Sequence, residues 1–355
     1  MAPGHALPAI QPAPPSHHLA YLDGWRGLAI AFLLLGHFYP VPGINFGAVG
    51  VNLFFVLSGL LMGQLLFVKA TPIPVFYRRR ISRIVPAHTA FIGAVLIFFA
   101  VTNRPIGWTE AAAALMFVNN YFPGQPGQPG ETAMPFGHIW SLSVEEHSYI
   151  LLSIVAMVCR KYNLNSKWIV GGLAACFAAT GAWYWSHYNG MVLDFDKWLR
   201  SEVSAYGIFI SAFLLLLLAQ HKVSRLQGMA APAFLILGIG LHWWSIPAPI
   251  KLALGVGAMA VGVNLLAGAP AWVTNFLSLK PLQMLGLWSF SIYLWQQPFY
   301  LAARKGHIPV IYAVVAAVTS GVLSYYFLER PVRRYLNRTW GQPGHTMDAT
   351  LHPTK

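Results

Sequence analysis

The stretch RGLAIAFLLLGH, residues 26–37, opens the first strongly apolar segment of the chain and still carries two ionisable residues, Arg26 and His37. Eleven helical steps of ~100° return to within roughly 20° of the starting direction, so both side chains project from one helix face, ~16 Å apart along the axis. Ionisable groups inside a bilayer are costly, which makes both residues functional candidates. The alternatives are a histidine hydrogen-bonded within a helix bundle and an arginine anchored at the membrane surface.

The composition of the whole chain is that of a polytopic membrane protein. Of its 355 residues, 56% are hydrophobic and only 9% are charged, and the mean hydropathy is +0.55. We therefore predict an all-α bundle of membrane helices. The net charge of +13 lies mostly in short loops between apolar runs, so it does not indicate nucleic-acid binding. Two cysteines form neither a disulfide framework nor a metal-binding pattern, so no metal is expected.

Ten apolar segments are long enough to be considered membrane spans. They cover residues 27–44, 47–68, 84–101, 138–158, 168–186, 201–219, 230–246, 252–268, 282–303 and 309–328. An eleventh stretch, 111–122, is shorter than the ~17 residues that a spanning helix usually needs. With ten spans and a cytosolic N-terminus, most loop arginines and lysines face the cytosol, as the positive-inside rule requires. The sequence thus predicts about ten transmembrane helices, with 111–122 as a re-entrant or interfacial piece.

The same topology defines the domain organisation. Residues 21–338 form one membrane domain, and residues 1–20 and 339–355 are expected to be disordered cytosolic tails. The loop 123–137 contains GQPGQPG and would face outward, either as a flexible connector or as a flap over an acceptor site.

Two cationic or polar stretches follow the first span. In the second span, Ser58 can supply a hydrogen bond to a site, although its many small neighbours indicate close helix packing. The next loop, FYRRRISRIVPAH, places Arg79, Arg80 and Arg83 close together on a helical surface. Arginine forks suit phosphate oxygens, so the cluster either binds a phosphate-rich ligand or anchors the protein to anionic membrane lipid.

The fourth span begins HIWSLSVEEHSY and contains adjacent carboxylates, Glu145 and Glu146, which a simple membrane anchor would not need. Ser141 shares the face of Glu145. If the helix enters the membrane near His138, Glu145 lies ~10 Å below the outer surface, which is the depth expected for His37. The two residues could form an oriented general base or a structural ion pair.

Six motifs in order resemble the integral-membrane acyltransferase family 3: LDGWRGLAIAFLLLGH, GVNLFFVLSG, RRRISRIVPAH, HIWSLSVEEHSY, SFSIYLWQQPF and LERPVRR. The resemblance covers about residues 20–335. It implies some ten spans and an acyl-CoA donor on the cytosolic side. The matching family positions are Arg26 with His37, Arg80 with Arg83, and Glu145. The chain departs from the family pattern at Asn52, where an acid is frequent, and at Gln296, where histidine is common.

The combined prediction is a bacterial inner-membrane O-acyltransferase with both termini in the cytosol. Acetyl-CoA would bind to Arg26, Arg79, Arg80 and Arg83, and His37, oriented by Glu145, would deprotonate a hydroxyl of a glycan or its lipid-linked precursor. Ser58, Ser141 and Glu146 are further site candidates, and an acyl intermediate on His37 or Ser58 stays open. The competing prediction is a proton-coupled or anion transporter that uses the same residues as a relay. A structural scaffold in an export complex is a third possibility.

Overall fold

The computed structural model describes residues 20–122, 134–187, 195–219 and 223–340, and all regular elements in these ranges are helical. The expected tails, apart from Ala20 and the two residues 339–340, and most of the GQPGQPG loop lie outside the described residues. The α-helices are α1 (Ala20–Phe38), α2 (Phe46–Gly63), α3 (Ile73–Val101), α4 (Trp108–Leu115), α5 (Trp140–Tyr162), α6 (Ser166–His187), α7 (Phe195–Leu199), α8 (Ser201–Ser204), α9 (Tyr206–Leu218), α10 (Arg225–Gly228), α11 (Ala231–Gly240), α12 (Ala248–Ile250), α13 (Gly257–Leu265), α14 (Ala271–Leu277), α15 (Lys280–Arg304), α16 (Val310–Ser324) and α17 (Arg330–Trp340).

Every apolar segment expected to span the membrane contains a helix. In the described part of the chain, six helical runs are long and apolar enough to cross a bilayer. They are Phe46–Val68, Ile73–Val101, Gly137–Tyr162, Ser201–Leu218, Ala248–Gly268 and Val310–Trp340. The total of about ten spans therefore stays a prediction. Helix α4 has eight residues and a length of ~12 Å, which is too short to cross the hydrocarbon core.

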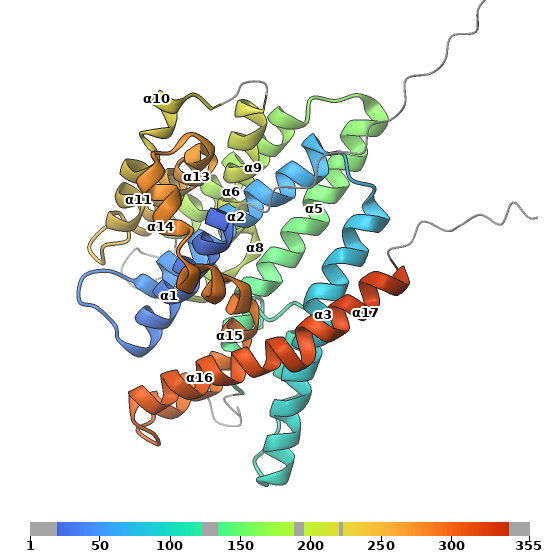
Figure 1. Cartoon of the computed structure of the whole chain (residues 1–355), viewed down its shortest axis with the longest axis vertical. Coiled ribbons are helices and arrows are strands. Elements are labelled where there is room, and N and C mark those ends of the chain that lie inside the picture. Colours follow the sequence, from blue (N-terminus) through green and yellow to red (C-terminus); the bar gives the residue numbers. More distant parts are fainter. Residues whose placement is uncertain (1–19, 123–133, 188–194, 220–222, 341–355) are drawn as a thin grey trace, which may run out of the picture.

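Helix α1 lies in the middle of the bundle and packs mainly against α15 and α2 (Figure 1). Glycines allow the backbones to touch: a Cβ on Gly286 of α15 would lie 1.9 Å from the Asp23 carbonyl oxygen. The buried indole of Trp25 donates to the Leu53 carbonyl of α2 at 2.9 Å. The backbones of α1 and α15 are thus in direct contact, and a buried indole links α1 to α2.

Two other features position the site. Helix α3 is 29 residues long because the arginine-rich loop expected before the third span is itself helical, and its last turns project beyond the rest of the molecule (Figure 1). Helices α16 and α17 continue into one another through a π-helical turn, Tyr325–Glu329, and form a diagonal rod across α3. We call the end of the bundle where α1 begins the Arg26 end, and the opposite end, where α1 finishes, the His37 end.

Candidate active site

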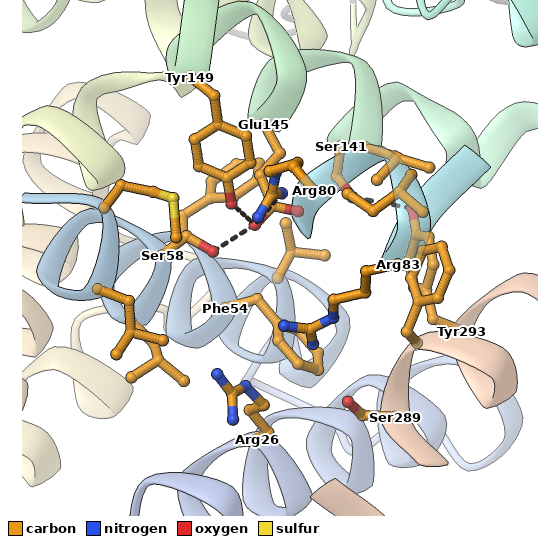
Figure 2. A pocket seen from close by; sticks show the side chains of 18 residues that line it. Arg26, Phe54, Ser58, Arg80, Arg83, Ser141, Glu145, Tyr149, Ser289 and Tyr293 are labelled. Carbon is orange, nitrogen blue, oxygen red and sulfur yellow. Dashed lines mark hydrogen bonds and ion pairs between the residues drawn. The ribbon is translucent and has the colours of Figure 1, made fainter. Parts of the chain in front are cut away.

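A cavity of about 90 Å³ lies between helices α1, α2, α3, α5 and α15 (Figure 2). Its wall combines apolar side chains with six of the nine site candidates that the sequence singled out; His37, Arg79 and Glu146 are not part of the lining. The polar lining consists of Arg26, Ser58, Arg80, Arg83, Ser141, Glu145, Tyr149, Ser289 and Tyr293.

Glu145 is the centre of a compact hydrogen-bonded cluster in this cavity. The hydroxyl groups of Ser58 and Tyr149 both donate to its Oε1 atom (Figure 2). The Arg80 Nη2 atom lies 3.6 Å from Glu145 Oε1 and 3.2 Å from Glu146 Oε1. The Arg80 guanidinium also lies over the Tyr149 ring, 3.4 Å from its centroid. Two carboxylates and an aromatic face therefore compensate the charge of Arg80 inside the bundle.

The remaining arginines are divided between the cavity and the surface. Arg26 pairs with Asp23 at 2.7 Å, and its guanidinium points toward that of Arg83 across the cavity (Figure 2). Arg83 makes no ion pair with any residue in the described ranges. Arg79 is exposed and does not line the cavity. The expected cluster is thus split because the inward face of α3 carries Arg80 and Arg83, while Arg79 lies outside it.

Ser141 lies in the same cavity and is paired with a tyrosine that the sequence reasoning did not select. Tyr293 donates its hydroxyl proton to the His138 carbonyl oxygen. Its oxygen lies 2.8 Å from Ser141 Oγ, so Ser141 must be the donor in that pair. Tyr149 and Tyr293 both occur within the quoted motifs, and a buried tyrosine in an apolar span is a signal that could have identified them.

His37 lies outside this cavity, at the other end of α1, where Gln296 is its hydrogen-bond partner. The His37 Nδ1 and Gln296 Oε1 atoms are 2.9 Å apart, and Gln296 Nε2 donates to Gln297 Oε1 at 3.2 Å. Because the Gln296 amide nitrogen is used in this way, its oxygen accepts from His37 Nδ1–H. The His37 Nε2 atom then carries the free lone pair and lies beside Gly47, which has no side chain to cover it. The imidazole ring stacks on the Tyr300 ring, with 4.8 Å between the ring centroids. This arrangement makes Nε2 available as a base.

The structure does not bring His37 and Glu145 together, so the expected pairing at matched depth is wrong. The chain enters the bundle before α5 begins, with Phe136 buried, so Gly137 already lies at the level of Gln297. Glu145 comes eight residues later, ~12 Å further toward the Arg26 end. Gln296, which replaces the histidine common in the family, lies beside the His37 imidazole, where the sequence had predicted Glu145. The other departure, Asn52, bonds to His242 at 2.9 Å, away from both groups.

A family model described as an acyltransferase domain matches residues 19–329. The chain belongs to this acyltransferase family. The match includes every helix that contributes to the cavity and to the surroundings of His37. The sequence-based assignment to the membrane acyltransferases is therefore confirmed, and the transporter alternative is not favoured.

Similar proteins carry acyl-transfer names. BcsY of Komagataeibacter xylinus, named as a membrane-bound transacylase, is 29% identical over 91% of this acyltransferase and 85% of its own length. The O-acetyltransferase OatA of Staphylococcus aureus (strain NCTC 8325 / PS 47) is 26% identical over 89% of this chain. YrhL of Bacillus subtilis, named as a peptidoglycan O-acetyltransferase, is 25% identical over 89%. The chain spans 57% and 55% of the length of OatA and YrhL. No solved structure matches it.

Proposed function

We propose that this acyltransferase moves an acetyl group from cytosolic acetyl-CoA to a hydroxyl of a surface or exported glycan, or of its lipid-linked precursor. One observation carries the proposal: a single helix, α1, carries a guanidinium in a polar cavity near one end and an imidazole with a free Nε2 at the other. The ~16 Å between Arg26 and His37 suits a long, thin thioester arm.

On the donor side, Arg26 and Arg83 are the proposed phosphate contacts. Two guanidinium groups that face the same space attract an anion, and no carboxylate oxygen of the described residues lies within 4.0 Å of the Arg83 guanidinium. A cavity of about 90 Å³ is too small for the arm, so donor binding requires flexible lining side chains such as Met62 to move. Arg80 keeps a different role, because it is already paired with Glu145 and Glu146: it holds these carboxylates in the wall of the donor cavity.

At the acceptor end, His37 Nε2 takes the proton of the attacking hydroxyl. The hydroxyl oxygen bonds to the thioester carbon, the carbon–sulfur bond breaks, and the CoA thiolate leaves with the proton that the imidazolium returns. Gln296 Oε1 stabilises the Nδ1–H that stays on the ring throughout. Gln296 Oε1 orients the His37 ring as the carboxylate of a catalytic triad orients its histidine, but it carries no charge.

A second route remains for the donor half of the reaction. The Ser58 hydroxyl donates to Glu145, which is the geometry of a nucleophile beside a base. Acyl transfer to Ser58 with release of CoA, followed by transfer onward, would make Glu145 directly catalytic. Ser58→Ala decides between the routes: it retains transfer in the direct mechanism and abolishes it in the acyl-serine mechanism.

The proposed location is a bacterial inner membrane, with both termini in the cytosol and the Arg26 end on the cytosolic side. This orientation would place the proposed phosphate contacts where acetyl-CoA is made. The His37 end would then face the compartment into which glycans are exported.

The test of the proposed function is CoA release from acetyl-CoA by purified, detergent-solubilised protein with a glycan acceptor. His37→Ala should abolish acceptor-dependent release while the protein keeps its melting temperature and still binds acetyl-CoA. The control is His187→Ala, which alters an exposed histidine at the end of α6 and should leave release unchanged. Wild-type turnover by a stable His37→Ala protein would rule out the catalytic assignment, and a wild-type protein that never consumes the thioester would rule out the function.

A further inference from the structure

A second hollow, of about 560 Å³, lies outside the site described above, between the last turns of α3 and the end of α15. Phe98 and Phe99 of α3 form one side, and Trp295, Phe299 and Ala302 of α15 form the other. The volume is in the ordinary range for ligand pockets, and most of the lining is apolar. It lies at the His37 end, because Tyr300, next to Phe299, stacks on the imidazole.

Basic side chains gather at the open end of this groove. Its lining includes Arg104, Lys305 and His307 and no aspartate or glutamate. The Arg104 guanidinium lies 5.5 Å from the centroid of the Phe98 ring and forms no ion pair with a residue of the described ranges. Lys305 and His307 are exposed. An apolar groove that ends in two permanent cations is complementary to an apolar chain with a phosphate head group.

The groove opens toward the membrane region rather than toward the catalytic histidine. Ile97 and Val101, on the same part of α3, are 66% and 76% exposed, as expected for side chains in contact with lipid. On α15, Trp295, Phe299 and Ala302 share one face. The partner of His37, Gln296, lies ~100° away from Trp295 around the helix. Neither His37 nor Gln296 lines the groove, so a ligand in the groove is not placed to react at the imidazole.

We propose that this groove binds one anionic glycerophospholipid of the bilayer, with an acyl chain between α3 and α15 and its phosphate on Arg104 and Lys305. The bound lipid braces α15 at the residue next to Gln296, so it also supports the orientation of His37. This site is separate from the proposed donor and acceptor sites, and lipid binding can be measured without any acyl transfer.

The binding experiment counts lipids retained by the full chain in native mass spectrometry, after titration with phosphatidylglycerol or phosphatidylcholine. Each surface cation contributes about fivefold to the affinity for anionic lipid, so Arg104→Gln with Lys305→Gln should weaken phosphatidylglycerol binding about 25-fold. Arg304→Gln is the matched control, because Arg304 is the exposed cation next to Lys305 and does not line the groove. It should change the affinity less than twofold.

A second pair of variants tests the groove itself. Ala302→Phe places a ring inside the hollow, where it competes with the acyl chain, and should reduce the retained lipid. Ala100→Phe adds the same ring at an exposed position of α3 outside the groove and should leave the retained lipid unchanged. Equal retention of phosphatidylcholine, or an equal loss with Arg304→Gln, would overturn the proposal in favour of unspecific charge or annular lipid. Displacement of phosphatidylglycerol by an equimolar polyprenyl phosphate would overturn the assigned occupant and indicate the lipid carrier of a glycan.

Discussion

Replacing Gln296 gives the sharpest test of how His37 is activated. The Gln296 side chain is fully buried, and its Oε1 atom is 2.9 Å from His37 Nδ1. Gln296→Leu keeps a similar volume but removes the acceptor. Gln296→Glu keeps an acceptor and adds the negative charge that the sequence had led us to expect from Glu145.

The two substitutions should act differently. A hydrogen bond to a charged group contributes about 1.5–3 kcal/mol, and this one stabilises the imidazolium that forms during proton transfer. At 1.36 kcal/mol per factor of ten, Gln296→Leu should lower kcat by about 10- to 150-fold. A carboxylate beside the ring favours the protonated imidazole, which cannot act as a base. Gln296→Glu should therefore move the acidic limb of the kcat profile to higher pH, by about 1–3 units.

The assay is acceptor-dependent CoA release between pH 5 and pH 10, together with thermal unfolding of each variant. Gln283→Glu is the control, because it adds the same charge near the start of α15, at a side chain that donates to the Ser278 carbonyl rather than to His37. It should not shift the profile. The reasoning is refuted if a folded Gln296→Glu protein has the wild-type acidic limb, or if Gln296→Leu turns over at the wild-type rate.

Three further outcomes follow from the structure. Arg83→Ala should raise the KM for acetyl-CoA by about 10-fold or more, because a charge-assisted phosphate contact is lost. Arg79→Ala changes a surface arginine and should alter this KM little. Equal effects of the two substitutions would favour a lipid anchor. Gly286→Ala should lower the free energy of unfolding by about 1–3 kcal/mol, because the new Cβ would lie 1.9 Å from the Asp23 carbonyl oxygen. Gly93→Ala is the control, because no atom lies within 4 Å of its new Cβ, and it should be neutral or slightly stabilising in a melting experiment. A reporter fused after Lys161 should be cytosolic, and an external signal there would invert the proposed topology.

Local patterns were enough to predict an all-helical membrane protein, although the number of spans stays a prediction. Apolar runs without charge have few alternatives to a helix in a membrane protein, and each of the ten expected segments contains a helix. Arg26, Ser58, Ser141 and Glu145, which the sequence singled out as separate site candidates, all line one cavity, as expected for polar groups in apolar helices that need partners in the interior.

Partners across helices could not be predicted in the same way. The depth of Glu145 was calculated from a helix that starts at the membrane surface, but α5 starts inside the bundle, after a buried segment that includes Phe136 and Ile139. A displacement of one or two helical turns moves a side chain by roughly 5–11 Å, which is enough to exchange every hydrogen-bond partner. Glu145 consequently bonds to Ser58 and Tyr149, and Gln296 takes the place beside His37.

The sequence by itself therefore determined the helical membrane bundle, the family, and several of the polar residues in its interior, such as Arg26 and Glu145, because these depend on hydrophobicity and on the spacing of residues along one helix. Only the tertiary structure decided that the polar residues form two groups, one around Glu145 and one around His37. The physical reason is that helix registers are set by close packing between helices, such as the contact of Gly286 with the Asp23 backbone, and no periodicity within a single helix encodes that register.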